Sequence, residues 1–202
     1  MRDSKEVVVR KANGQDELKA IFRLRYESYL RKGYIPSNPD GIMLDEWDEL
    51  STTTHFVAME NGELLGAVRF VMDSTRGLPM ERVFQEAINQ LRKHGRKIAE
   101  ASTMVVAGDQ SGSSQRLWVK LCRALWEEAE ARHIDDLCVA VTQNHVGFYK
   151  RLLFEVIGKG RHYKSLNGIL AYPLRVRVAE VRIRHKSHGS NHDQSLRKHL
   201  LE

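Results

Sequence analysis

Residues 97–132 have the sequence KIAEASTMVVAGDQSGSSQRLWVKLCRALWEEAEAR, and this stretch decides the fold. It predicts a strand that ends in Met104-Val105-Val106, a polar loop over residues 107–115 and a long amphipathic helix. Ser113 or Ser114 can cap that helix. A strand that leads into a helix directs free backbone N–H groups and the positive end of the helix dipole at one point. Such a point suits a phosphate group.

Hydrophobic periodicity predicts the remaining elements. Apolar runs indicate strands, helical spacing of apolar residues indicates helices, and Asn61-Gly62 marks a tight hairpin. The order of these elements is typical of an α/β or α+β fold with a central mixed sheet. The predicted strands are Val7–Val9, His55–Met59, Leu64–Met72, Leu137–Val141 and Ile169–Val176, and the predicted helices are Gln15–Arg31, Pro79–Arg92 and Val146–Leu153.

The length of 202 residues corresponds to one domain, which we assign to residues 1–178. Basic and apolar residues alternate over Arg175–Arg184, which predicts an exposed edge strand with a charged face. The residues after it are polar and have no apolar spacing. We therefore expect residues 179–202 to form a basic edge strand and a flexible tail.

Composition excludes several classes of protein. No apolar run approaches the roughly 20 residues that span a bilayer, and Met1–Ala12 is charged where a secretory signal would be apolar. Cys122 and Cys138 fall in segments with the pattern of a buried helix and a buried strand, which indicates two packing thiols. The nine histidines show no metal-ligand spacing. We expect a cytoplasmic protein without a membrane span or a metal.

The net charge of +6 is unevenly distributed. Residues 1–90 contain 12 Lys+Arg and 15 Asp+Glu, whereas residues 91–202 contain 20 and 11. The second part of the chain is therefore basic and would attract nucleic acid, anionic lipid or an acidic carrier protein. Charge alone does not choose among these partners.

Two motifs resemble the GCN5-related N-acetyltransferase (GNAT) superfamily. The first is the strand, loop and helix over Ala99–Arg132, and the second is Asn144–Phe154, in which Tyr149 follows Asn144 by five positions. The resemblance implies a mainly antiparallel sheet with a splayed central strand pair and places Tyr149 beside the phosphate site as a proton donor. The loop Gly108–Arg116 lacks the superfamily's Gly-x-Gly/Ala pattern, which closes around a pyrophosphate.

The altered loop fits a donor with a single phosphodiester better than coenzyme A. The phosphopantetheine arm of acyl carrier protein is such a donor, and acyl carrier proteins are strongly acidic, which would explain the basic second part of the chain. This interpretation makes four residues at the loop and the helix candidates for binding the carrier or its arm: Ser113, Ser114, Arg116 and Lys120.

The first part of the chain resembles the acyl-homoserine-lactone synthases, a branch of the same fold that depends on acyl carrier protein. The resemblance covers about residues 22–154. It departs at Thr103, where lactone synthases have Arg, and at Tyr34, where they usually have Trp. The runs Leu78–Phe84 and Lys97–Ser102 are similar to long-chain N-acyl amino acid synthases of the FeeM type. The residues that follow the order and nearly the spacing of the lactone synthases are Arg25, Tyr29, Tyr34, Asp45, Asp48, Arg69, Phe84 and Glu100.

This resemblance implies transfer of a long fatty acyl chain from acyl carrier protein to the α-amine of an amino acid, with tyrosine as the first candidate. The sequence has no Gly-x-Ser-x-Gly motif, and Cys122 inside a helix is a poor nucleophile, so we expect direct transfer without an acyl-enzyme. The thioester would enter between Met104–Val106 and Leu137–Val141, and an amide near Val105 or Val106 would stabilise the oxyanion. Glu100 would be the base and Tyr149 the acid for the thiolate. Candidates for the acyl channel are Phe84, Met104 and Leu121, and the further substrate-binding candidates are Arg25, Tyr34, Asp45, Trp47, Asp48, Arg69 and Ser102.

Several alternatives remain open at the level of sequence. Glu100 can instead be the ion-pair partner of Arg69, and Tyr149 can be a core residue. Asp45 and Asp48 can form a solvated loop face or an ion-pair cluster with Arg25 and Arg69, or either arginine can hold the acceptor's carboxylate. Two other functions compete with the main one: a lactone synthase that uses S-adenosylmethionine, and a non-catalytic nucleic-acid-binding module that uses the basic edge.

Overall fold

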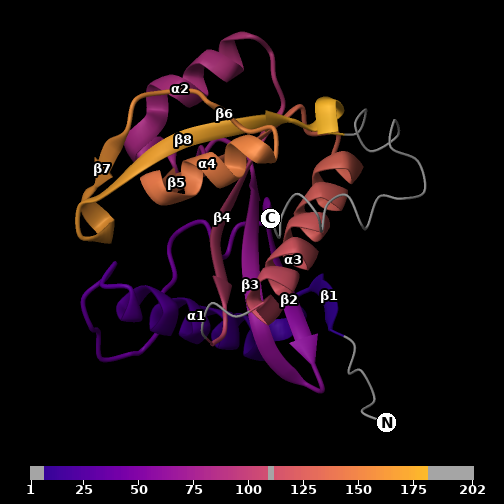
Figure 1. Ribbon diagram of the computed structural model, residues 1–202, viewed down its shortest axis with the longest axis vertical. Coiled ribbons are helices and arrows are strands. Elements are labelled where there is room, and N and C mark those ends of the chain that lie inside the picture. The colour runs from indigo at the N-terminus through magenta and orange to yellow at the C-terminus, as the bar shows by residue number, and fades with distance from the viewer. Residues whose placement is uncertain (1–6, 109–111, 182–202) are drawn as a thin grey trace.

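The computed structural model describes residues 7–108 and 112–181, apart from the side chain of Ser113. Its centre is an eight-stranded sheet in the order β1-β2-β3-β4-β5-β8-β6, with β7 also paired to β8 (Figure 1). Each pair is antiparallel except β4–β5. The strands are β1 (Val8–Lys11), β2 (Thr53–Glu60), β3 (Glu63–Met72), β4 (Ile98–Val106), β5 (Asp136–Thr142), β6 (Glu155–Val156), β7 (Arg161–Tyr163) and β8 (Ile169–Arg177).

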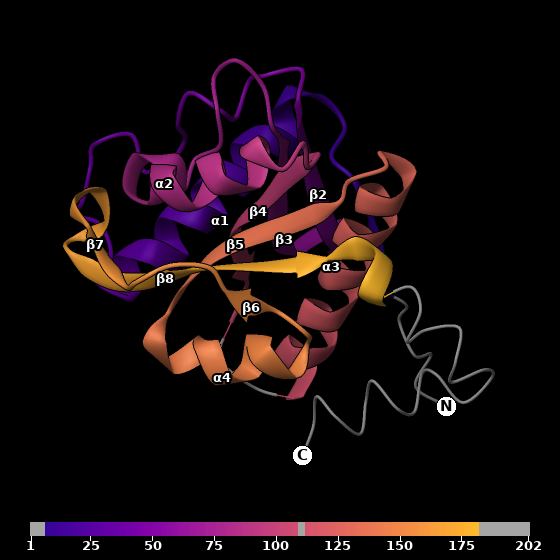
Figure 2. The ribbon, with the colours of Figure 1, turned by 90° about the horizontal axis from the view of Figure 1, so that it is seen from above.

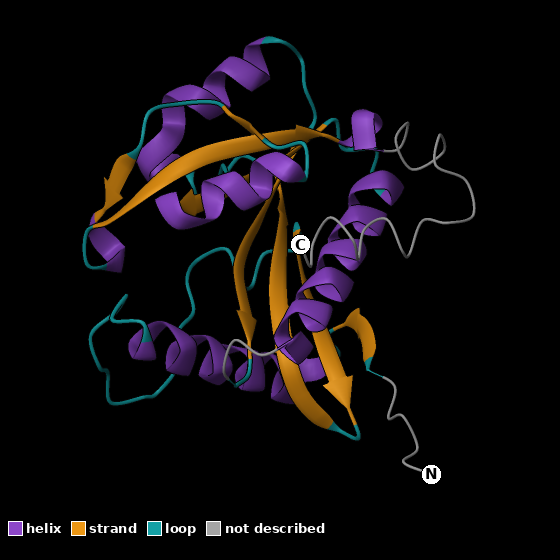
Figure 3. Cartoon of the chain, in the orientation of Figure 1, coloured by secondary structure: helices purple, strands orange, loops and turns teal. Residues whose placement is uncertain are grey.

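Helices cover both faces of the sheet (Figure 2). Helices α1 and α2 lie on one face and α3 and α4 on the other, which gives three layers. Figure 3 shows the same helices and strands coloured by type. Apolar side chains therefore form separate cores on the two faces. The helices are α1 (Gly14–Arg31), α2 (Glu81–Lys93), α3 (Gly112–Ala131), α4 (Gln143–Arg151) and the short 3₁₀ helix η1 (Lys164–Leu166).

The predicted fold class, element order and central hairpin are confirmed. Glu60 of β2 pairs with Glu63 of β3, so the turn has only two residues. Asn61 and Gly62 both have positive φ angles (51° and 83°), as a type I′ turn requires. The hairpin fixes β2 and β3 in the middle of the sheet, next to β4.

Strands β4 and β5 separate at the centre of the sheet. They pair only from Ile98 to Glu100 on β4, so the rest of β4 has no partner on its β5 side among the described residues. The β3–β4 register shifts between Ala67 and Arg69, and Thr103 opposite this shift has a φ of 50°. A bulge of this kind bends a strand. The splayed strand pair is thus present, and Glu100 stands where the strands part.

The edge-strand prediction for Arg175–Arg184 is wrong over residues 175–181, and the rest of that range lies outside the described residues. Strand β8 ends at Arg177 and lies inside the sheet between β5 and β6, and residues 178–181 are helical. Arg175 is not a free edge cation, because it bonds Asp136 of β5 and Glu155 of β6. Arg175 is thus paired within the sheet, whereas Arg177 bonds Glu180 in the helical residues that follow. The predicted tail lies outside the described residues.

Three smaller points complete the fold. The short strands β6 and β7 were not predicted, because runs of two and three residues have no periodicity to detect. Cys122 and Cys138 are unbonded thiols, as expected. Within residues 7–108 and 112–181, no helix has the length and apolar character needed to cross a membrane.

Candidate active site

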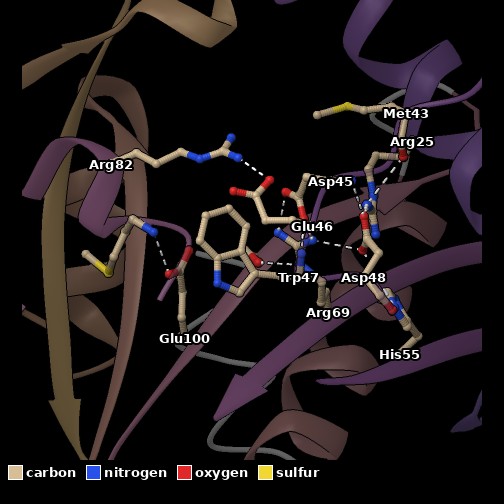
Figure 4. Close-up of polar contacts among 12 residues, drawn as sticks. Arg25, Met43, Asp45, Glu46, Trp47, Asp48, His55, Arg69, Arg82 and Glu100 are labelled. Carbon is tan, nitrogen blue, oxygen red and sulfur yellow. Dashed lines mark hydrogen bonds and ion pairs between the residues drawn. The ribbon is translucent and has the colours of Figure 1, made fainter. Parts of the chain in front are cut away.

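A buried ion cluster joins α1, β3 and the loop between α1 and β2 (Figure 4). The Arg25 guanidinium on α1 contacts both oxygens of Asp48, at 2.9 and 3.0 Å. The Arg69 guanidinium on β3 donates to Asp48 at 2.8 Å and to both oxygens of Asp45, at 2.6 and 3.1 Å. Both arginine side chains are only 1% exposed. The ion-pair alternative for Asp45 and Asp48 is therefore correct, and the solvated-face alternative is wrong.

The charges of the cluster are paired, although the Arg25 Nε and the His55 Nδ1 are buried without a hydrogen-bond partner among the described residues. Burial alone would raise the pKa of Asp48, but Arg25 and Arg69 hold that pKa below its ordinary value. Burial also lowers the pKa of His55, whose Nε2 lies 3.1 Å from the Asp48 carbonyl oxygen as a neutral donor. Because their carboxylate partners already occupy Arg25 and Arg69, neither arginine is available to hold an acceptor's carboxylate. The cluster fixes the loop against the sheet.

Glu100 lies on the same face of the sheet but in a different setting. The residue is 3% exposed, and its Oε2 accepts one hydrogen bond, from the Met80 amide at the start of α2, at 2.8 Å. Burial raises the pKa of Glu100 to about 8, although the Met80 amide and the charge of Arg69 act to lower it. The predicted ion pair with Arg69 is absent from the contacts of the described residues. Instead, the Arg69 Nε donates to Ser102 at 3.1 Å.

Aromatic side chains pack together near the Glu100 carboxyl group. Trp47 packs in one core cluster with Met80, Phe84 and Tyr163, and its indole N–H donates to the Gly77 carbonyl at 2.9 Å. The ring centroids of Phe84 and Tyr163 are 5.7 Å apart. Sequence reasoning missed Met80 and Tyr163. A main-chain donor has no signature in sequence, and Tyr163 reaches the site from β7, which was not predicted.

Tyr149 lies on the opposite face, on α4. Its ring packs edge-on against Trp118, Phe148 and Phe154, with ring centroids 5.1 to 6.0 Å away. Burial raises the pKa of the Tyr149 hydroxyl well above its ordinary value, so the group remains protonated. Met104 packs in the same cluster as Tyr149. The two faces of the sheet thus present a carboxyl group and a phenol, one on each side of the gap between β4 and β5.

The predicted channel residues do not lie together. Phe84 packs beside Trp47 on the face that carries Glu100, whereas Met104 and Leu121 pack on the α3 face. A single channel lined by Phe84 and Met104 would therefore have to pass through the gap between β4 and β5. Leu121 is fully buried against the sheet and contacts the Gly66 position, which makes it a core residue.

The backbone of β4 distinguishes the two predicted oxyanion donors. The Ala107 amide donates to Leu65 of β3 at 2.7 Å. Because successive amides of a strand point in opposite directions, the Val105 amide faces β3 and the Val106 amide faces the open gap. Of the two predicted donors, Val106 therefore has the orientation that a substrate in the gap requires, and Val105 does not.

The other candidates lie farther from Glu100. Tyr34 follows α1 and packs on Tyr29 with ring centroids 5.7 Å apart. Ser113 and Ser114 lie in the first turn of α3, and Arg116 on the same helix is exposed. The Lys120 ammonium is not free for a carrier, because it donates to the Val7 carbonyl at 2.7 Å. Loop residues 109–111 lie outside the described residues. No cluster of potential metal ligands occurs among the described side chains.

A model of the FeeM N-acyl amino acid synthase family matches residues 20–177. The chain belongs to this family. The FeeM family resemblance is thus confirmed, and the protein is an acyltransferase with a GNAT-like fold. It follows that the alternative of a non-catalytic nucleic-acid-binding module is wrong. Comparison with curated proteins gave no match.

Several solved structures share the architecture. The structure of FeeM, an N-acyl amino acid synthase from uncultured soil microbes, is 26% identical, with a TM-score of 0.78 over 89% of this chain and 94% of that one. The acyl-homoserine-lactone synthase LasI is 23% identical, with a TM-score of 0.62 over 87% and 91%. The CoA-dependent lactone synthase BjaI is 18% identical, with a TM-score of 0.65 over 91% and 90%. The latter two show the fold alone.

Proposed function

We propose that this FeeM-family enzyme transfers a long-chain fatty acyl group from acyl carrier protein to the α-amine of an amino acid, with tyrosine as the first candidate. The observation that carries the proposal is the buried Glu100 carboxyl group at the point where β4 and β5 part. Its pKa of about 8 lies near physiological pH, as a general base for an ammonium group requires. The active domain is residues 1–178, working in the cytoplasm.

The reaction is a direct displacement at the thioester. The acceptor ammonium gives one proton to the ionised Glu100, and the free amine attacks the thioester carbon. The Val106 amide donates a hydrogen bond to the resulting oxyanion, a contact worth about 3 kcal/mol of barrier in other acyl-transfer enzymes. Collapse forms the amide and breaks the C–S bond. The thiolate takes a proton from Tyr149, which solvent reprotonates. The amide nitrogen releases its second proton to solvent, and Glu100 releases the proton that it took, which regenerates the base.

The two faces of the sheet give the two substrates separate approaches. The donor arm would enter from the side of α3 and α4, where Tyr149 and the start of α3 lie. The acceptor would bind on the side of α1 and α2, where Trp47, Phe84 and Tyr163 form an aromatic wall beside Glu100. An aromatic amino acid suits that wall, because aromatic rings pack edge-on at such centroid distances.

Reconstitution tests the proposal. Purified enzyme is incubated with long-chain acyl carrier protein or the matching acyl-CoA and a mixture of the twenty amino acids, and the products are identified by mass spectrometry. We expect an amide-linked acyl amino acid, with tyrosine preferred and a higher kcat/KM for the carrier-bound donor. Release of methylthioadenosine from S-adenosylmethionine, with an acyl lactone as product, would identify a lactone synthase instead.

Charge reversal tests the carrier separately. Arg116→Glu should raise the KM for acyl carrier protein at low salt, because exposed charges steer an acidic partner and salt screens them. Lys93→Glu makes the same charge change at an exposed position on α2, on the other side of the sheet, and should leave that KM unchanged. Equal KM values for the two variants would exclude the start of α3 as the carrier site.

A further inference from the structure

A third arginine lies near Glu100 and differs from the two in the buried cluster. Arg82 lies in the first turn of α2, two residues after the Met80 whose amide binds Glu100. Its guanidinium lies 4.5 Å from the centroid of the Trp47 ring. We propose that Arg82 binds the α-carboxylate of the acceptor amino acid. The inference rests on the proposed function and names the residue that makes the site selective for amino acids over simple amines.

The geometry suits an α-amino acid, which carries its ammonium and its carboxylate on the same carbon. In Figure 4 the Trp47 indole lies between the Arg82 guanidinium and the Glu100 carboxyl group. Trp47 is 4% exposed and Arg82 already lies over its ring, so an acceptor would bind at the edge of the indole, with its ammonium toward Glu100 and its carboxylate toward Arg82. Both charged groups also lie close enough to affect the Tyr163 hydroxyl. Burial raises the pKa of Tyr163, Glu100 raises it further, and Arg82 acts to lower it.

Arg82 is available for a ligand, unlike the buried arginines. It bonds Glu46, in a pair whose side chains are 44% and 40% exposed. Such surface pairs contribute only about 0–1 kcal/mol, so an incoming carboxylate can replace Glu46 at little cost. A guanidinium holds a carboxylate through two parallel hydrogen bonds, and stacking on Trp47 keeps its plane oriented. Arg69, in contrast, is 1% exposed and already bonds two carboxylates.

The test compares tyrosine with its primary amide, which keeps the amine and the ring but has no carboxylate. Arg82→Gln should lower kcat/KM for tyrosine by about 10- to 100-fold, which corresponds to losing hydrogen bonds to a charged group. The loss should appear as a higher KM for tyrosine, while the KM for the acyl donor stays unchanged. The kcat/KM for tyrosine amide should stay within about twofold of wild type. The acid-to-amide ratio of kcat/KM is therefore the decisive quantity.

Two control variants separate this role from general effects. Arg76→Gln makes the same change at an exposed arginine that precedes α2, and should keep the wild-type ratio. Glu46→Gln removes the competing carboxylate and should leave the ratio at or above the wild-type value. If wild-type enzyme acylates amino acids but Arg82→Gln keeps the wild-type ratio, the assignment of Arg82 is wrong. If wild-type enzyme acylates no amino acid, the proposed function fails, and this inference fails with it.

Discussion

Two buried carboxyl groups on one face of the sheet have opposite properties. Asp48 is held by Arg25, Arg69 and the Asp45 amide, and its pKa is lowered. Glu100 has a single amide donor among the described residues, and its pKa is raised to about 8. Burial is common to both, so the charges of Arg25 and Arg69, which contact Asp48 but not Glu100, make the main difference. We infer that Asp48 supports the fold and that Glu100 carries out chemistry.

The largest expected effect comes from removing the base. Glu100→Gln keeps the shape and the acceptor for the Met80 amide but cannot take a proton. Under the proposed mechanism, kcat for acyl transfer should fall by about 10²- to 10⁴-fold, measured by product formation under saturating substrates. Glu86→Gln, the same change at an exposed position of α2, should keep wild-type kcat. Wild-type kcat in a folded Glu100→Gln enzyme would remove Glu100 from the mechanism.

Substitution of Asp48 should mainly reduce stability, whereas substitution of Glu100 should mainly reduce kcat. Asp48→Asn leaves the buried Arg25 guanidinium without a counter-charge, and breaking a buried pair costs about 3–5 kcal/mol. Urea denaturation should show a fall of this size in the free energy of unfolding, while Asp40→Asn at an exposed position of the same loop should change it by less than about 0.5 kcal/mol. A fall below about 1 kcal/mol would show that Arg25 finds another partner and that the contrast with Glu100 is weaker than the geometry indicates.

The sequence predicts the contacts of Asp48 more completely than those of Glu100. Arg25, Asp48 and Arg69 are strongly charged side chains at recognisable spacing, and the cluster they form was among the predicted alternatives. The environment of Glu100 depends on a backbone amide of Met80, and main-chain donors leave no pattern in sequence. The same limit applies to Val105 and Val106, because only the bulge and the alternation of amides distinguish them.

Contacts between residues distant in sequence explain the other differences between the prediction and the structure. Arg175 alternates with apolar residues as an edge strand would, but Asp136 and Glu155 neutralise it inside the sheet, and these partners are distant in sequence. The Lys120 side chain bonds the backbone of Val7, 113 residues away. Local periodicity predicts which residues form strands and helices, whereas the partner of a charged side chain depends on the tertiary structure.

The pH dependence of stability also distinguishes Glu100 from Asp48. Because the pKa of Glu100 is raised from about 4.5 to about 8 on folding, its protonated form stabilises the fold, and this contribution is lost as pH rises. Wild-type stability should therefore decrease, relative to Glu100→Gln, by about 2 kcal/mol between pH 6 and pH 8. Urea denaturation of both proteins at the two pH values measures this difference. Parallel behaviour would mean that Glu100 is ionised throughout this range.

The smallest effect concerns the bulge beyond Glu100. Thr103 has a φ of 50°, a conformation that costs a β-branched residue about 1–2 kcal/mol. Its buried hydroxyl has no hydrogen-bond partner among the described residues. Thr103→Gly should therefore raise the free energy of unfolding by up to about 1 kcal/mol, after the added entropy of the unfolded chain is subtracted.

Thr53→Gly provides the matched control for this bulge. Thr53 also has a buried hydroxyl without a described partner, but it lies in β2 without a positive φ, so glycine there should destabilise the protein by about 1 kcal/mol. Opposite signs for the two variants, in parallel urea titrations, would locate backbone strain at the bulge. Strain near Glu100, beside an ion cluster in which each arginine bonds a carboxylate, fits a strand held open for a substrate, because strained backbone concentrates where ligands bind. Destabilisation of equal size in both variants would instead make Thr103 an ordinary strand residue and leave the gap between β4 and β5 without a strained hinge.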